Sequence, residues 1–213
     1  MSDIKIGRMV LGSVSTNTYF IYREESPETI VVDPADYGEL IHDKLAQNGR
    51  KVVAILLTHG HFDHIWGVEA LKKAAGADSV SVYASEAEKS LLGDTRKNVS
   101  AQAGRPCAIT ADHYLKDGEE CTIAGMTFRT IATPGHTEGG CCFYFPEGEI
   151  LVSGDTLFQD SVGRTDLPTG NMGTLVRSIR EKLFVLPEEV KVYPGHGEVT
   201  TIGHEKQYNP FCV

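Results

Sequence analysis

The residues with the clearest capacity for chemistry gather in one short run, where three histidines and one aspartate fall close together. The run spans residues 58–64 and reads THGHFDH, which supplies His59, His61, Asp63 and His64. Further along the chain, two histidines follow Pro-Gly pairs and one aspartate follows a Ser-Gly pair; these are His136, His196 and Asp155. Imidazole and carboxylate groups suit borderline divalent ions such as zinc, iron and manganese. The sequence therefore predicts a metal centre.

The number of candidate ligands indicates two ions rather than one. A single structural zinc takes four ligands and usually includes thiolates, but none of the five cysteines falls within this set. Seven nitrogen and oxygen ligands divided over two ions leave open positions for water and substrate, as a catalytic site requires. Asp155 is the natural ligand to share between them. Asp63 and Asp155 are thus the candidate catalytic carboxylates, each acting mainly by holding metal.

The ordered set of HxHxDH, Gly-His, Gly-Asp and a second Gly-His resembles the metallo-β-lactamase superfamily over nearly the whole chain. The resemblance places three histidines on a first ion: His59, His61 and His136. It places three ligands on a second ion: Asp63, His64 and His196. Asp155 is shared by both ions. The expected cofactors are two divalent ions, with zinc as the first choice and iron or manganese as alternatives.

A second superfamily motif is matched by residues 31–36, which read VVDPAD. The resemblance implies that Asp33 lies beside the metal loop and hydrogen-bonds a ligand, which would orient the ligand toward its ion. The alternative is a simple turn at the end of a strand.

Strands and helices alternate along both halves of the chain, which predicts a mixed α/β (α+β) fold. Ten apolar segments are predicted as strands: 4–11, 18–22, 29–32, 52–57, 80–83, 121–123, 127–132, 140–145, 150–152 and 190–193. Helices are predicted over 36–48, 67–75 and 86–92, and around the apolar stripe of Leu175, Ile179 and Leu183. Residues 94–114 are predicted as a loop or short helix. The resemblance implies a four-layer αββα sandwich with the metals at one edge, in one domain over residues 1–213.

The net charge and the lengths of the apolar runs limit the classes of partner that the protein can have. The formal net charge is −9 and there is no basic run, which argues against a nucleic-acid substrate. There is no export signal pattern, and no apolar run approaches the ~20 residues that span a bilayer. We therefore expect a cytoplasmic protein with a small-molecule substrate, no nucleic-acid partner and no membrane partner. The sequence does not give the oligomeric state.

Within the superfamily, the chain resembles the short bacterial hydroxyacylglutathione hydrolases, the glyoxalase II group. The stretches that carry this resemblance are 154–158 (GDTLF), 161–168 (SVGRTDLP), 193–197 and 209–211. They imply hydrolysis of a hydroxyacyl thioester such as S-lactoylglutathione to a 2-hydroxy acid and a free thiol, as in methylglyoxal detoxification. Two divalent ions activate water for this reaction, so no serine or cysteine nucleophile is needed.

Three departures leave the thiol carrier open. The long enzymes of this group add a C-terminal helical domain that binds glutathione, and this chain is too short to contain it. Asp166 stands where those enzymes have an aromatic residue, and Glu198 replaces a tyrosine. Arg164 keeps the basic position and is the candidate substrate-binding residue, because guanidinium pairs well with a carboxylate. Its alternative is a surface pair with Asp166 or Asp160.

Three other functions remain to be distinguished. Persulfide dioxygenases share the GRTD stretch and would use one iron on His59, His136 and Asp155, without Asp63, His64 and His196 as ligands. Antibiotic hydrolysis is disfavoured, because the β-lactamases of the superfamily usually carry cysteine where Asp155 stands and have export signals. A metal-binding protein without catalytic activity is the third alternative. Two ions per chain would favour the hydrolase.

Overall fold

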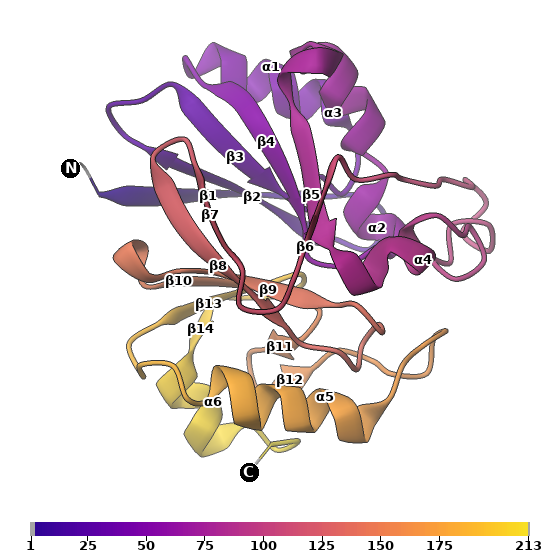
Figure 1. Cartoon of the computed structure of the whole chain (residues 1–213), viewed down its shortest axis with the longest axis vertical. Helices are drawn as coiled ribbons and strands as arrows, with labels where there is room; N and C mark the ends of the chain where they lie inside the picture. Colours follow the sequence, from indigo (N-terminus) through magenta and orange to yellow (C-terminus); the bar gives the residue numbers. More distant parts are fainter. Residues whose placement is uncertain (1–2, 213) are drawn as a thin grey trace.

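The computed structural model describes residues 3–212, and two six-stranded sheets lie face to face in it (Figure 1). The first sheet has the strand order β1-β2-β3-β4-β5-β6. Its strands are β1 (Ile4–Leu11), β2 (Thr16–Arg23), β3 (Glu28–Val32), β4 (Lys51–Leu57), β5 (Ser81–Ser85) and β6 (His113–Leu115). The first three strands pair antiparallel, whereas β3 to β6 pair in parallel through crossover connections.

The second sheet has the strand order β14-β13-β10-β9-β8-β7. Its strands are β7 (Glu120–Ile123), β8 (Met126–Ala132), β9 (Cys141–Phe145), β10 (Ile150–Gly154), β13 (Lys191–Pro194) and β14 (Thr200–Thr201). Only β10 and β13 pair in parallel in this sheet. A small hairpin of β11 (Leu157–Phe158) and β12 (Ser161–Val162) follows β10.

Helices cover the two outer faces, so the molecule has the predicted αββα layers (Figure 1). Helices α1 (Gly38–Gln47) and α3 (Val68–Ala75) lie on the first sheet. Helices α5 (Met172–Ser178), continued by the wider turn Ile179–Leu183, and α6 (Ile202–Tyr208) lie on the second. Two short helical pieces, α2 (Phe62–Ile65) and α4 (Lys89–Leu92), lie close to one edge of the sandwich. The predicted fold class is confirmed.

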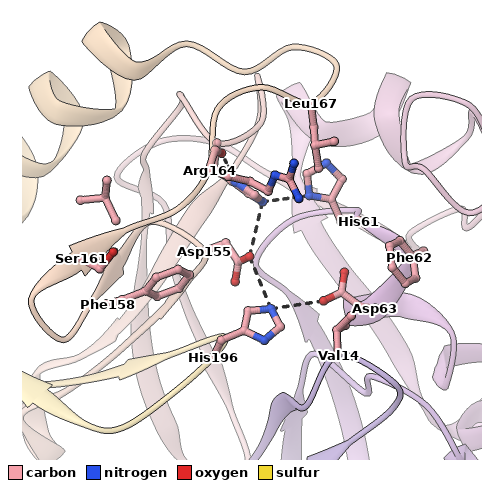
Figure 2. A pocket seen from close by; sticks show the side chains of 12 residues that line it. Val14, His61, Phe62, Asp63, Asp155, Phe158, Ser161, Arg164, Leu167 and His196 are labelled. Atoms are coloured by element: carbon pink, nitrogen blue, oxygen red, sulfur yellow. Dashed lines mark hydrogen bonds and ion pairs between the residues drawn. The ribbon is translucent and has the colours of Figure 1, made fainter. Parts of the chain in front are cut away.

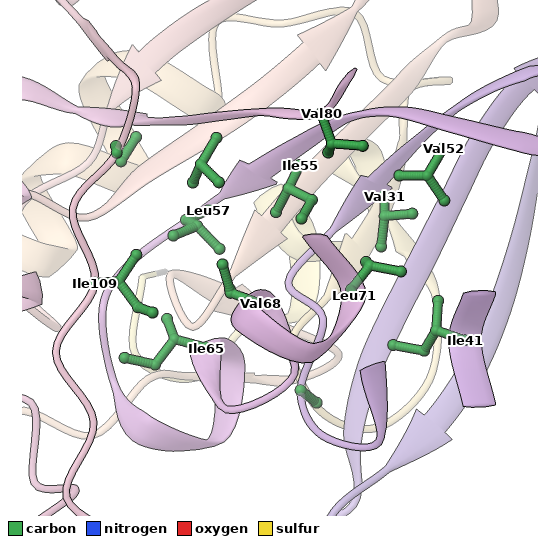
Figure 3. Packing of buried hydrophobic residues seen from close by; sticks show 14 of the residues in the cluster. Val31, Ile41, Val52, Ile55, Leu57, Ile65, Val68, Leu71, Val80 and Ile109 are labelled. Carbon is green, nitrogen blue, oxygen red and sulfur yellow. The ribbon is translucent and has the colours of Figure 1, made fainter. Parts of the chain in front are cut away.

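Period-two alternation along the central strands builds three separate cores. In β3 and β4, Ile30 and Leu56 enter the core between the sheets, while Val31 and Ile55 pack under α1 and α3 (Figure 3). In β10, Val152 enters the same central core and Leu151 packs beneath α5. Both faces of these strands are buried, which explains why they are continuous apolar runs in the sequence.

The structure corrects two parts of the predicted element pattern. The segment 94–114, predicted as a loop or short helix, ends in β6, which adds to the edge of the first sheet. Only Leu115 of this strand is buried, so its apolar signal in the sequence is too short to read. Helix α6 was not predicted; its buried positions are Ile202 and Glu205, and a buried glutamate breaks the apolar pattern of a packed helix face.

The ends of the expected domain, residues 1, 2 and 213, lie outside the described residues. Among residues 3–212, no helix is long and apolar enough to cross a membrane.

Candidate metal centre

All seven predicted ligands follow the ends of four strands. β4 ends at Leu57 and leads directly into the ligand run. Strands β8, β10 and β13 end just before His136, Asp155 and His196. Helix α2 begins at Phe62, so Asp63 and His64 lie in its single turn, and the His64 ring packs against the His59 ring with 4.1 Å between the centroids. Rigid strands thus fix one end of each ligand loop.

Two triads of ligand atoms result. The nitrogen atoms of the first triad, His59, His61 and His136, lie within 4.8 Å of one another. His136 Nε2 lies 2.8 Å from His61 Nδ1 and 3.3 Å from His59 Nε2. The second triad is Asp63, His64 and His196, whose ligand atoms also lie within 4.8 Å of one another.

Asp155 lies between the two triads. Its Oδ2 is 3.6 Å from Nε2 of His136 in the first triad and 3.6 Å from Nε2 of His196 in the second. Its Oδ1 is 3.4 Å from His64 Nε2. Figure 2 shows Asp155 and Asp63 on either side of His196 at the edge of the cavity. A carboxylate in this place can contact an ion in either triad.

The buried atoms of this site fit metal ions. Within the described part of the chain, His64 Nε2 and Asp155 Oδ1 are buried and have no hydrogen-bond partner. Buried polar atoms without a partner are costly, and native structures contain few of them. Imidazole nitrogens that face one another at hydrogen-bond distance also need a proton or a cation between them. The donor set therefore fits two divalent ions.

Neighbouring groups orient three of the ligand rings. Each ring is held at Nδ1: His59 by Thr58 Oγ1 at 3.1 Å, His64 by Asp33 Oδ2 at 2.9 Å, and His136 by the Arg164 carbonyl oxygen at 2.6 Å. This fixes the tautomer and leaves Nε2 free for metal. The hydrogen bond from a ligand to Asp33 is the one expected from the sequence, whereas the Arg164 carbonyl was not predicted, because a backbone acceptor has no sequence signature.

The electrostatic surroundings differ between the triads. Burial and the neighbouring imidazoles lower the pKa of His59 well below its usual value and lower the pKa of His61 to about 3. At His64, burial acts in the same direction, but the surrounding carboxylates outweigh it and raise the pKa. The rings of His59 and His61 are therefore neutral near pH 7, which is the form that binds metal.

A cavity of about 440 Å³ opens beside the triads, within the range of small-molecule sites. Its wall is largely apolar and includes Val14, Phe62, Phe158, Val162 and Leu167. Arg164 also lines it (Figure 2). The guanidinium donates two hydrogen bonds of 2.7 Å to Asp166, and both side chains are mostly exposed. Both sequence interpretations of Arg164, as a residue of the substrate site and as a partner of Asp166, are thus compatible with one conformation.

Two known proteins are similar to this chain over most of its length. A probable metallo-hydrolase of Streptococcus pyogenes is 38% identical over 98% of this chain and 90% of its own length. The hydroxyacylglutathione hydrolase GloC of Haemophilus influenzae is 33% identical over 88% of this chain and 89% of its own length.

Three solved structures have a fold similar to that of this chain. The BLEG-1 B3 metallo-β-lactamase has a TM-score of 0.92 and 39% identity, covering 98% of this chain and 100% of its own. The di-iron-bound form of TTHA1623 has a TM-score of 0.83 and 34% identity, covering 96% and 99%. ETHE1 from Myxococcus xanthus has a TM-score of 0.75 and 28% identity, covering 97% and 83%. The profile of the metallo-β-lactamase superfamily matches residues 11–196. The chain therefore belongs to the metallo-β-lactamase superfamily.

Proposed function

We propose that this protein is a binuclear metal-dependent hydrolase that cleaves a hydroxyacyl thioester, such as S-lactoylglutathione, to a 2-hydroxy acid and a free thiol. The observation that carries the proposal is the position of Asp155, with one oxygen at 3.6 Å from a histidine of each triad. The similarity to GloC supports the substrate class, and the di-iron form of TTHA1623 supports two ions. Zinc is the first choice of metal, with iron or manganese as alternatives.

Bound divalent ions would supply Lewis-acid activation of water and of a carbonyl group. The side chains of the protein position the ligands and line the substrate cavity. Thr16 Oγ1 donates to Asp63 Oδ2 at 2.9 Å, which fixes this carboxylate beside His196. Phe62, Phe158 and Leu167 form an apolar wall against which the acyl group of a substrate would pack. A thiol with a pKa near 8.5 leaves as thiolate with little help, so the site needs no separate general acid.

The similarity to BLEG-1 gives a second candidate function, because that protein is named as a B3 metallo-β-lactamase. The cyclic amide of a β-lactam is also an acyl electrophile.

The persulfide dioxygenase alternative leaves the second triad without a role, yet His64 Nε2 is a buried atom without a hydrogen-bond partner among the described residues. This observation favours two ions over one iron.

The test is anaerobic release of free thiol from S-D-lactoylglutathione by the metal-loaded protein, with nitrocefin hydrolysis measured in parallel. We expect rapid thiol release that a chelator abolishes, and slow or absent nitrocefin cleavage. Cleavage of nitrocefin alone would replace the thioesterase proposal with lactam hydrolysis. Oxygen uptake with glutathione persulfide, together with one iron per chain, would replace it with the dioxygenase.

A paired substitution tests Arg164. If its guanidinium binds a substrate carboxylate, Arg164→Ala should raise KM about fivefold to tenfold and change kcat little, because an exposed ion pair contributes modestly. Asp166→Asn removes the competing partner at 2.7 Å and should lower KM. Steady-state kinetics with S-D-lactoylglutathione measures both. An unchanged KM in both variants would show that Arg164 only pairs with Asp166 at the surface.

A further inference from the structure

One buried carboxylate outside the ligand set connects two of the ligand loops. Glu88 is 1% exposed and ends the short helical turn Glu86–Glu88 that precedes α4. Its Oε1 accepts a hydrogen bond from the Gly60 N–H at 2.8 Å. Its Oε2 accepts from Thr137 Oγ1 at 3.1 Å and from the Gly139 N–H at 2.9 Å.

The donors come from the two loops of the first triad. Gly60 lies between His59 and His61, and Thr137 follows His136. One oxygen of Glu88 therefore holds the first loop and the other oxygen holds the second. The two loops are far apart in the sequence, and their relative position determines whether the three histidines converge.

Both loops pack closely at a glycine on this connection, most tightly at Gly139. A Cβ atom at Gly139 would lie 2.1 Å from the Glu88 backbone nitrogen. A Cβ atom at Gly60 would lie 2.8 Å from Leu91 Cδ2. Because the contact at Gly139 is with backbone, the loop after His136 approaches Glu88 this closely only without a side chain there, whereas at Gly60 the ends of leucine side chains would have to shift.

Burial makes a carboxylate costly at this position. Burial raises the pKa of Glu88 to about 7, and the three donated hydrogen bonds only partly offset it. The interactions of its carboxylate among the described residues include no basic side chain. A buried charge without a counter-ion is costly, and the three donated hydrogen bonds offset part of that cost. A carboxylate does, however, offer two acceptor oxygens to two loops at once.

We propose that Glu88 is a positioning residue for the first metal site, where its two oxygens tie the His59–His61 loop to the His136 loop. This inference rests on the proposed metal centre and is independent of the substrate. None of these three hydrogen bonds joins Glu88 to a residue of the second triad. The affinity of the second triad for metal should therefore not depend on Glu88.

The test measures Co²⁺ affinity by competition with a chelator in two background variants. His196→Ala leaves the first triad intact, and His61→Ala leaves the second. Glu88→Gln keeps the size of the side chain but places an NH₂ group against an N–H or O–H donor. We expect it to weaken Co²⁺ binding about 10- to 100-fold in the His196→Ala background and less than about twofold in the His61→Ala background.

Glu86→Gln is the matched control, because Glu86 lies on the same turn and is exposed. If Glu88→Gln does not fold, Thr137→Val removes one of the three hydrogen bonds and should weaken the same site about threefold to tenfold. Losses of equal size in both backgrounds, or no loss in either, would overturn the proposal. Failure of the wild-type protein to bind Co²⁺ would overturn the metal centre as well, whereas a failure of thioester hydrolysis alone leaves this result unaffected.

Discussion

Replacement of Asp155 by alanine is expected to abolish thioester hydrolysis and to weaken the binding of both ions. Asp155 is the one predicted ligand whose oxygens approach histidines of both triads, at 3.6 Å on each side. Its loss also leaves His64 without one of its neighbouring carboxylates. We expect kcat/KM to fall by at least about a thousandfold, because the loss affects both the metals and their relative placement.

Metal content after dialysis and single-turnover thiol release measure the two effects separately. Asp43→Ala is a suitable control, since this carboxylate is exposed on α1 and remote from the ligands. An Asp155→Ala protein that retains two metals and near-normal turnover would contradict the role of this residue as a shared ligand. Loss of only one equivalent, with the other bound as tightly as before, would assign Asp155 to one ion.

The layered fold could be predicted because its strands carry a strong signal. The strands β3, β4 and β10 are buried on both faces, so each gives a continuous apolar run that no surface element would have. The signal fails for short elements with few buried side chains. β6 buries only Leu115, and β12 has two residues, of which Val162 is buried.

The candidate ligands could be identified from spacing, because HxHxDH confines four of them to one loop and one helical turn. The groups that orient these ligands could not be identified from the sequence. Glu88 lies in no motif, and its partners Gly60 and Gly139 are 28 and 51 positions away. The carbonyl of Arg164 acts through the backbone, and any residue type could supply it. Such contacts depend on how distant loops pack, which local sequence patterns do not encode.

Asp33 offers the largest effect that can be measured without metal. Its side chain is buried and accepts three hydrogen bonds, from the Thr58 N–H at 2.8 Å, Thr58 Oγ1 at 2.6 Å and His64 Nδ1 at 2.9 Å. Asp33→Ala would leave these donors without an acceptor in the protein interior. We expect the free energy of unfolding of the metal-free protein to fall by about 3 kcal/mol, and Tm by roughly 6–12 °C.

Asp33→Asn separates the contributions of the three bonds. Asparagine tolerates the positive φ of 49° at this position, and its carbonyl oxygen keeps an acceptor, but its NH₂ group faces a donor. The loss should therefore lie between those of Asp43→Ala and Asp33→Ala in a denaturant titration. If His64 is oriented by Asp33, Co²⁺ affinity in the His61→Ala background should fall about 10- to 100-fold in parallel with stability. Normal stability in Asp33→Ala would mean that the Thr58 and His64 donors find other acceptors, and the orienting role of Asp33 would then be wrong.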